Sequence, residues 1–276
     1  MRQKHKQFSS RVMQKKEVSS GTFHMRLEAP FLSQNVNPGQ FIMVRTSDTY
    51  DPLLRRPFSL CGADQNSVDI LFQVRGKGTD IMSGWEQGQE VGMIGPLGNG
   101  FNTSEPMRLA YIVAGGIGIA PLLFLIRLLE EKGTAIKLFF GGKSERDILF
   151  IEYFNLKNSD VFIATEDGSR GFQGFVTDLL LEYIKKNHQQ HDDSLNMFGC
   201  GPVGMSKLLS GIASTYNAVC QLSLEEHMAC GTGACLGCVV PSRCGSNSSK
   251  KDASSPEYKR VCVEGPVFGS DEIEWK

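Results

Sequence analysis

Three cysteines, Cys230, Cys235 and Cys238, lie close together near the C-terminal end of the chain. A fourth, Cys262, follows after an interval of 23 residues. The spacing C-x4-C-x2-C…C is the plant-type ligand pattern of a [2Fe–2S] cluster, a centre that four thiolates hold and that transfers electrons. The sequence therefore predicts an electron-transfer protein, and the rest of the chain must supply a donor, an acceptor or a route between them.

Glycines in the same run, Gly231, Gly233 and Gly237, favour a loop that wraps closely round such a cluster. Glycine adopts backbone conformations that other residues resist, and backbone N–H groups in the loop can point at the cluster sulfurs and raise the reduction potential. A zinc site or a disulfide framework is the alternative. Zinc motifs pair one C-x2-C with a second one or with histidines. This run has a single C-x2-C, so we favour the cluster.

Cys244 competes with Cys262 for the position of the fourth ligand. It lies in the polar, serine-rich stretch 242–257, which predicts a loop. Cys262 lies in the segment Tyr258–Val263, whose alternation is typical of a strand end. Because a rigid element holds a ligand best, we expect Cys262 to bind the cluster and Cys244 to be a free surface thiol.

Length and composition limit the classes of protein to which the chain can belong. Its 276 residues allow two or three small domains, and 41% hydrophobic residues suffice for ordinary cores. A formal net charge of −1 gives no sign of a nucleic-acid partner or of binding to an anionic membrane. No apolar run reaches the roughly 18 residues that predict a membrane span, and the basic N-terminus lacks the apolar core of a secretory signal.

The number and positions of the cysteines indicate the redox environment of the protein. The chain has eight cysteines, of which four belong to the expected cluster. Cys61, Cys200 and Cys220 lie in apolar or glycine-rich segments. A reducing environment suits this pattern better than a secreted location, so we expect a cytoplasmic protein.

The chain divides by pattern into three regions. Residues 1–104 hold short strand-like runs, such as Phe41–Arg45 and Val68–Val74, punctuated by glycine and proline as in a closed antiparallel barrel. Residues 105–222 alternate buried strands with helices, which predicts a parallel sheet. Residues 223–276 form the expected cluster domain.

Loops after the strands of the second region form a candidate nucleotide site, because ligands bind parallel sheets at the carboxyl ends of the strands. The expected strands cover 108–114, 135–140, 161–165, 195–198 and 218–222, and the expected helices 120–132, 175–186 and 202–213. The candidate residues are Gly115, Gly116, Gly118, Glu166, Asp167, Cys200 and Gly201. The first turn follows a strand and opens a helix, as a dinucleotide requires, although it is not the full G-x-G-x-x-G fingerprint. Each loop alone also fits an ordinary turn, and Cys200 a small buried residue.

The barrel region holds another candidate site. Arg56 can neutralise a diphosphate through paired hydrogen bonds, and the extended residues Pro57, Phe58 and Ser59 can offer backbone groups and a hydroxyl to a flat ring. A glycine-rich turn precedes a helix expected at 80–85, and helix N-termini bind phosphate. The candidate residues of this turn are Val74, Gly76, Gly78 and Thr79. Each piece alone also fits a surface loop with scattered basic residues.

Taken together, the segments Arg56–Ser59, Gly115–Gly118 and Cys200–Pro202 resemble the ferredoxin–NADP reductase superfamily over roughly residues 10–222. With Met228–Val240 and Arg260–Phe268 added, nearly the whole chain looks like the electron-transfer subunits of type B dihydroorotate dehydrogenase. This resemblance implies an α+β multidomain fold: an antiparallel β-barrel that carries FAD, a Rossmann-like α/β domain that binds the pyridine nucleotide, and a small C-terminal [2Fe–2S] domain.

The resemblance also implies roles for single residues. It assigns FAD contacts to Arg56, Pro57, Phe58, Ser59, Gly78 and Thr79, and cluster ligation to Cys230, Cys235, Cys238 and Cys262. The nicotinamide would lie against the flavin near the Cys200 turn. One departure is visible, because the polar loop 242–257 looks longer than the usual link between the third and fourth ligands.

The implied activity is electron transfer in pyrimidine biosynthesis. A partner subunit carrying FMN would oxidise dihydroorotate to orotate, and electrons would pass to the [2Fe–2S] cluster, to FAD and then as a hydride to NAD+. The flavin converts single-electron transfer into hydride transfer, so this chain needs no general acid or base. The expected assembly is a heterotetramer with two copies of each subunit, and we expect neither nucleic acid nor membrane as a partner.

Local charges favour NAD over NADP. A 2′-phosphate needs a basic pocket, but Lys143 and Arg146 alternate with acidic residues after the 135–140 strand. Glu166 and Asp167 would repel a phosphate if they faced the ribose.

Two other functions fit parts of the pattern. The chain could be the flavin subunit of an NAD(P)H:ferredoxin or sulfide reductase complex, although an aspartate replaces one cluster cysteine in those relatives. It could also be a redox sensor that binds flavin and cluster without turnover, which would need no intact nicotinamide site.

Overall fold

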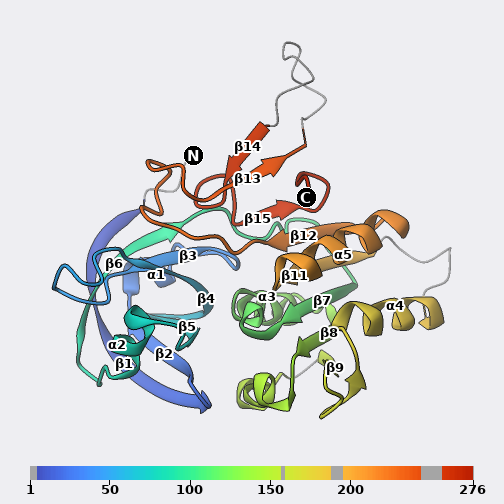
Figure 1. The fold of residues 1–276 in the computed structure, drawn as a ribbon, viewed down its shortest axis with the longest axis horizontal. Coiled ribbons are helices and arrows are strands. Elements are labelled where there is room, and N and C mark those ends of the chain that lie inside the picture. The colour runs from blue at the N-terminus through green and yellow to red at the C-terminus, as the bar shows by residue number, and fades with distance from the viewer. Residues whose placement is uncertain (1–4, 157–158, 188–194, 244–256, 276) are drawn as a thin grey trace.

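The computed structural model describes residues 5–156, 159–187, 195–243 and 257–275. Cys244 and most of the polar stretch around it lie outside these ranges. The N-terminal barrel and the α/β sheet lie side by side in Figure 1, and the C-terminal segment lies across both.

Six antiparallel strands close into a barrel within the described N-terminal region, in the order β1-β2-β5-β4-β3-β6. Their bounds are β1 Lys6–Ser19, β2 Thr22–Glu28, β3 Phe41–Val44, β4 Arg56–Asp64, β5 Ser67–Gln73 and β6 Glu90–Leu97, with short helices α1 Pro30–Ser33 and α2 Lys77–Ser83. Strand β3 is buried on both faces. Ile42 and Val44 point into the barrel core, whereas Phe41 and Met43 point outward into a second apolar cluster, as the two-residue period of a strand requires.

A seven-stranded sheet forms the second layer of the described structure, in the order β10-β9-β8-β7-β11-β12-β15. The bounds are β7 Leu109–Gly115, β8 Ala135–Gly142, β9 Ser159–Thr165, β10 Phe172–Gln173, β11 Asn196–Cys200, β12 Val219–Ser223 and β15 Val267–Gly269. Neighbouring strands are parallel except at β15, which pairs antiparallel with β12. The C-terminal segment is therefore attached to the edge of this sheet.

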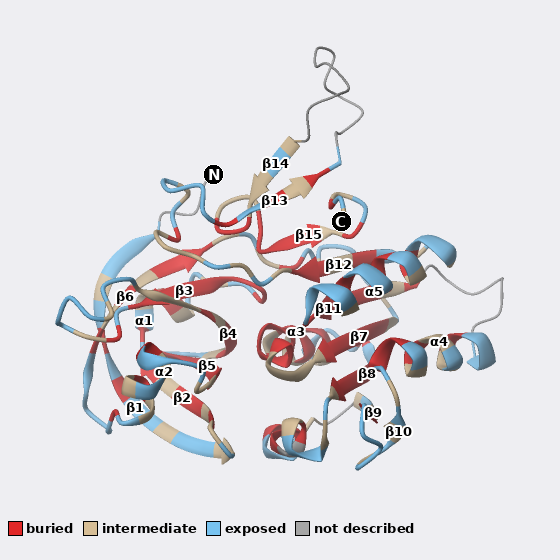
Figure 2. Cartoon of the chain, viewed as in Figure 1, coloured by how far each residue is buried: buried red, intermediate tan, exposed pale blue. Residues whose placement is uncertain are grey.

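Helices cover both faces of the sheet (Figures 1 and 2). Along β7, Ala110 and Ile112 pack toward α3 (Ile119–Glu131), whereas Tyr111 and Val113 pack toward α4 (Val176–Asn187) and α5 (Val203–Thr215). Such burial on both faces explains why β7 is an unbroken apolar run rather than an alternating one. Short 3-10 helices complete this region: η1 Gly116–Gly118, η2 Glu145–Asp147 and η3 Leu149–Phe154.

Polar side chains, as well as apolar packing, join the barrel to the α/β region. Asp69 of β5 accepts two hydrogen bonds from Arg26 of β2, at 2.8 and 3.0 Å, and lies 3.6 Å from His24 Nε2. The hydroxyl of Tyr153 in η3 lies 3.3 Å from His24 Nδ1. Burial raises the pKa of Asp69, but the neighbouring His24 and Arg26 outweigh burial and hold the pKa at about 2. His24, between Asp69 and Tyr153, thus links this network in the barrel to η3.

The C-terminal segment forms a two-stranded ladder, β13 Val239–Ser242 with β14 Glu257–Arg260. Val239 pairs with Arg260 in its register. Cys238, Val240, Val261 and Cys262 join Phe41 and Met43 of β3 in one apolar cluster. The ladder is therefore packed against the outside of the barrel.

Most of the expected elements are present, with two shifts. The helix expected at 80–85 begins earlier, at Lys77, because the Thr79 hydroxyl accepts hydrogen bonds from the backbone N–H groups of Arg75 and Gly76 and closes the first turn there. The strand expected to hold Cys262 ends at Arg260, and Cys262 lies in the tight turn that follows. Among the described helices, none combines the length and apolar composition of a membrane crossing.

Candidate functional site

The four predicted cluster ligands meet as two pairs of thiols. Cys230 interacts with Cys235, and Cys238 with Cys262. The seven cysteines that the structure describes are all free thiols, and no three His, Cys, Asp or Glu side chains among the described residues converge to hold a single metal ion. Four cysteine thiols gathered in this way supply the donor set that a [2Fe–2S] cluster needs, so the residues present fit that group.

Backbone N–H groups point at three of these sulfurs. Thr232 donates to Cys230, Gly237 to Cys235 and Cys262 to Cys238, each at 3.4 Å from N to Sγ. Burial raises the pKa of Cys230, but hydrogen bonds from Thr232 and Cys235 reverse the effect and lower it to about 6. Burial raises the pKa of Cys262, and its hydrogen bond to Cys238 and the charge of Cys238 raise it further, to about 12.

The ligand loop has a buried side and an exposed side. Cys238 and Cys262 are each only 2% exposed, whereas Cys235 is exposed. On the buried side, Gly231 has a left-handed φ of +70°, and a β-carbon there would lie 2.5 Å from Met43 Cγ. Glycine at this position lets the loop contact β3 directly.

Four of the residues predicted to contact FAD lie on β4, the neighbour of β3 in the barrel. Arg56, Pro57, Phe58 and Ser59 begin β4, which pairs with β3 in the register Met43 to Pro57 and Phe41 to Ser59. The ligand loop therefore contacts β3, and these predicted flavin residues lie on its neighbour β4.

The predicted diphosphate cradle is assembled around Gly78. A β-carbon there would lie 3.1 Å from Arg56 Nε and 3.3 Å from Thr46 Oγ1. Thr46 is 3% exposed, and its hydroxyl has no hydrogen-bond partner among the described residues. A buried orphan hydroxyl beside an arginine fits a site whose polar groups are completed by a ligand. The remaining predicted residues are close by: Val74 follows β5, Gly76 caps α2, and Thr79 closes its first turn.

Two of the predicted nucleotide loops are in direct contact. A β-carbon at Gly118 would lie 2.5 Å from the Cys200 carbonyl oxygen, and one at Gly201 would lie 3.0 Å from Gly115 Cα. The two turns follow β7 and β11, neighbours in the sheet. Gly116, in η1, has a φ of +53°, so the turn requires glycine.

The third predicted loop lies at the same edge, two strands away. Glu166 and Asp167 follow β9, and their backbone N–H groups donate to the carbonyls of Gly142, the last residue of β8, and Lys143, the next residue, at 3.1 and 3.2 Å. The Asp167 carboxylate accepts hydrogen bonds from Ser169. All three loops therefore lie at the carboxyl edge of the sheet, but the loop that holds Glu166 and Asp167 lies apart from the other two.

Sequence reasoning missed Glu225. It lies two residues after the end of β12, and its carboxylate lies 4.0 Å from Cys200 Sγ. Glu225 is exposed, but the protein atoms packed near its carboxylate raise its pKa, while the charge of Arg75 opposes this effect. Burial, followed by the Glu225 charge, raises the pKa of Cys200 and keeps its thiol neutral. Glu225 therefore lies beside Cys200 at the nucleotide edge. Its place after the last parallel strand was the one signal available in the sequence.

Comparisons with known proteins decide the family. Residues 225–274 match the iron-sulfur cluster binding domain of dihydroorotate dehydrogenase B, and residues 112–210 match the oxidoreductase NAD-binding domain. The chain is 38% identical, over 98% of its length and 99% of the relative's, to the electron transfer subunit of dihydroorotate dehydrogenase B (NAD(+)) from Desulforamulus reducens. The corresponding subunit from Bacillus cereus is 35% identical over 95% of this chain and 96% of its own.

The chain belongs to the family of dihydroorotate dehydrogenase B electron transfer subunits. Among solved structures, an NADH-dependent reduced ferredoxin-NADP oxidoreductase is similar with a TM-score of 0.79 and 25% identity, over 96% of this chain and 90% of that one. The cytochrome b5 reductase domain of Ulva prolifera nitrate reductase has the same fold, with a TM-score of 0.59 and 18% identity over 73% and 89% of the two chains. The barrel and sheet of this electron transfer subunit are thus those of the reductase superfamily.

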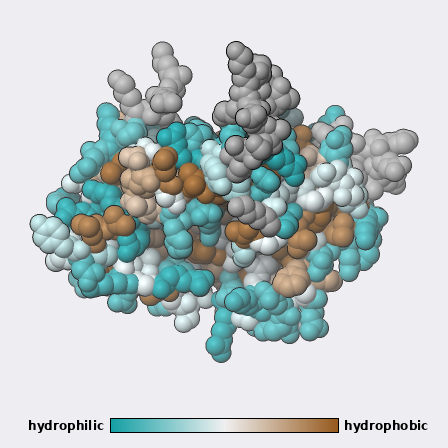
Figure 3. Space-filling model, turned by 45° about the horizontal axis from the view of Figure 1, so that its top comes forward, coloured by the Kyte–Doolittle hydropathy of each residue, from teal (hydrophilic) through white to brown (hydrophobic). Residues whose placement is uncertain are grey.

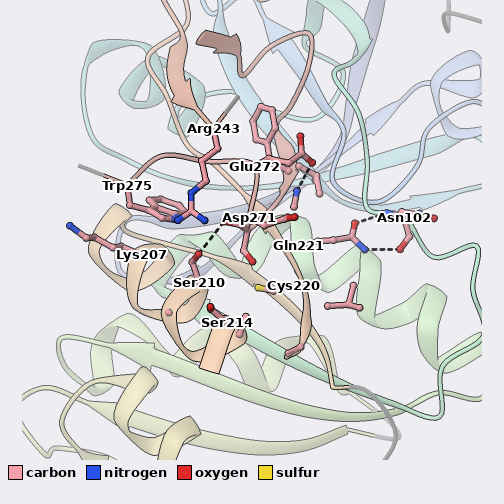
Figure 4. Close-up of a pocket in the computed structure, with 18 of the residues that line it drawn as sticks. Asn102, Lys207, Ser210, Ser214, Cys220, Gln221, Arg243, Asp271, Glu272 and Trp275 are labelled. Atoms are coloured by element: carbon pink, nitrogen blue, oxygen red, sulfur yellow. Dashed lines mark hydrogen bonds between the residues drawn. The ribbon is translucent and has the colours of Figure 1, made fainter. Parts of the chain in front are cut away.

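A further cavity of about 1030 Å³ lies away from these sites. Figure 4 shows it between α5, the start of β12 and the C-terminal residues, with Lys207, Arg243, Asp271 and Trp275 around it. It is at the amino ends of the parallel strands, opposite the nucleotide edge, and none of the residues lining it was predicted to bind a cofactor.

Proposed function

We propose that this electron transfer subunit carries electrons from an FMN-containing catalytic subunit, through a [2Fe–2S] cluster and FAD, to NAD+. Dihydroorotate loses two electrons and two protons when the catalytic subunit converts it to orotate, and NAD+ takes up two electrons and one proton as a hydride. When bound, the flavin exchanges electrons singly with the cluster and as a hydride with the nicotinamide. The reaction belongs to pyrimidine biosynthesis in the cytoplasm.

The position of β3 is the observation that supports this route best. Its outward residue Met43 contacts the ligand loop at Gly231, and its ladder with β4 places Met43 opposite Pro57. The cluster and the flavin would therefore be held against the two members of one strand pair. We assign residues 1–104 to FAD, 105–222 to NAD and 223–276 to the cluster, with the predicted residues above as ligands.

At the nucleotide site, this chain's residues position the nicotinamide and disfavour NADP, and none of them is assigned a role as an acid or a base. The contact between Gly118 and the Cys200 carbonyl fixes the turn on which the nicotinamide would rest. Cys200 is 1% exposed, and its raised pKa keeps it a neutral thiol. Glu166 and Asp167 add negative charge at the same edge, which disfavours the 2′-phosphate of NADP.

The exposed side of the ligand loop is where we place the catalytic subunit. Leu236, between two ligands, is 60% exposed, and Val239 and Tyr258 of the ladder are also exposed. Figure 3 shows hydrophobic side chains among hydrophilic ones on the face turned forward. Exposed apolar groups beside a redox centre favour a protein partner, and we propose a heterotetramer with two copies of each subunit.

Rapid mixing of the FAD-loaded subunit with pyridine nucleotides tests the nucleotide end of the route. We expect NADH to bleach the flavin absorbance much faster than NADPH does, because the acidic edge disfavours the extra phosphate. The Gly118→Ala variant should lose this reaction, since its β-carbon would collide with the Cys200 carbonyl, while keeping its FAD. A flavin that neither nucleotide reduces would support the redox-sensor function instead, and faster reduction by NADPH would refute the assignment to NAD.

A further inference from the structure

Arg260 contacts or adjoins the segments that carry all four predicted ligands. Its Nη1 donates to the carbonyl of Gly233, between Cys230 and Cys235, at 3.3 Å. Its cross-strand partner is Val239, next to Cys238, and Cys262 lies two residues further along the chain. A single guanidinium therefore lies against the cluster loop from the side of β14.

Close approach of this guanidinium depends on a glycine. Gly233 has a left-handed φ of +84°, and a β-carbon there would lie 3.0 Å from Arg260 Nη1 and 2.6 Å from Val263 Cγ2. Any larger residue would push the arginine away from the loop. This glycine thus has a second role beyond bending the loop round the cluster.

Glu264 holds the arginine in place and supplies its counter-charge. The Glu264 carboxylate accepts hydrogen bonds from Arg260 Nε at 3.0 Å, from Nη2, and from the Arg260 backbone N–H at 2.8 Å. The hydrogen bond to Glu264 and then its charge raise the pKa of Arg260, so the guanidinium remains positive. Of the two side chains, Arg260 also donates to the Gly233 carbonyl of the ligand loop. The positive member of the pair is therefore the one that lies against the loop.

We propose that Arg260 raises the reduction potential of the [2Fe–2S] cluster and that Glu264 limits this effect by partial neutralisation. The proposal rests on the ligand set assigned under the proposed function. Reduction adds one negative charge to the cluster, so a nearby cation favours the reduced state, and net charge around a cluster is one of the determinants of its potential. Solvent screens exposed charges, and Arg260 and Glu264 are 32% and 37% exposed, so the effect should be partial rather than dominant.

The chain offers a matched control pair one residue away. Lys259 forms an ion pair with Glu272, at similar exposures of 30% and 42%, and lies over the ring of Phe268. The side chains of Lys259 and Glu272 hydrogen-bond to each other rather than to the ligand loop, and Glu272 also accepts from the Gly269 backbone N–H. Charge removal at this pair measures the effect of a surface charge that does not contact the ligand loop.

Redox titration of the intact subunit, loaded with FAD and cluster and followed by electron paramagnetic resonance, tests the proposal. The midpoint potential of the cluster should fall in Arg260→Gln, stay near the wild-type value in Arg260→Lys, and rise in Glu264→Gln, with the double Gln variant between the two single ones. Lys259→Gln and Glu272→Gln should shift it far less.

The opposite signs separate an electrostatic role from a structural one, because loosening of the loop gives no reason for Glu264→Gln to raise the potential. An unchanged or lower potential in Glu264→Gln, or equal shifts at the control pair, would overturn the proposal. If Arg260→Gln fails to assemble the cluster, Glu264→Gln still decides. A wild-type subunit without the cluster signal would instead refute the ligand set.

Discussion

Replacement of Cys262 by serine should abolish the visible absorption and the paramagnetic signal of the [2Fe–2S] cluster while leaving FAD bound. Cys262 is 2% exposed and pairs with Cys238 in the apolar cluster on the outside of the barrel. A serine there offers a hard, weakly acidic hydroxyl where iron requires a thiolate. The flavin should remain because its predicted residues are in β4, on the other side of β3.

Cys244→Ser is the control for this experiment, since Cys244 is the other candidate for the fourth ligand. It should keep the full cluster spectrum with the iron content of the wild type. The two spectra are compared after identical anaerobic purification, together with iron and flavin analysis. A cluster that survives in Cys262→Ser and disappears in Cys244→Ser would contradict the ligand set and the pairing of thiols on which it depends.

Replacement of Arg56 by glutamine should weaken FAD binding by roughly 10- to 100-fold, because a charge-assisted hydrogen bond contributes about 1.5–3 kcal/mol. Arg56 Nε lies at the Gly78 cradle beside the orphan hydroxyl of Thr46. No other residue we predict to contact FAD carries a positive charge, so its loss leaves the diphosphate without a charged partner there.

Arg55→Gln provides the matched control for the Arg56 variant. The Arg55 guanidinium donates to the Gly92 carbonyl on β6, at 2.8 Å, and not to the cradle. Fluorescence titration of the flavin-free proteins with FAD gives the two dissociation constants. Equal weakening in both variants would show that the loss reflects general damage to the barrel, and unchanged binding in Arg56→Gln would refute the assigned diphosphate site.

The parts of the site that lie in short stretches of sequence could be predicted. The spacing of Cys230, Cys235 and Cys238 is sufficient to indicate a ligand loop, and Arg56–Ser59 forms a continuous segment of one strand. The turn at Gly115 could be placed at the carboxyl edge because parallel strands share that edge. These predictions required no knowledge of how distant segments pack.

The remainder depends on contacts between distant segments, which no local pattern encodes. Glu225 lies beside Cys200 only because β12 ends next to β11 at the same edge of the sheet. Arg260 reaches the Gly233 carbonyl only because the turn after β14 folds back on the ligand loop. Strand β15 joins the α/β sheet although it follows the cluster ligands in sequence, an antiparallel addition that a pattern of alternating strands and helices does not predict.

The central claim is that the cluster lies between the catalytic subunit and FAD on the route to NAD+. The most direct measurement is NADH formation from dihydroorotate and NAD+ by the co-expressed complex, with either the wild-type or the Cys262→Ser electron transfer subunit. We predict that the wild-type complex forms NADH, and that the variant complex forms almost none although NADH still bleaches its flavin. Dihydroorotate-dependent NADH formation at the wild-type rate by a complex proven to lack the cluster would contradict the account.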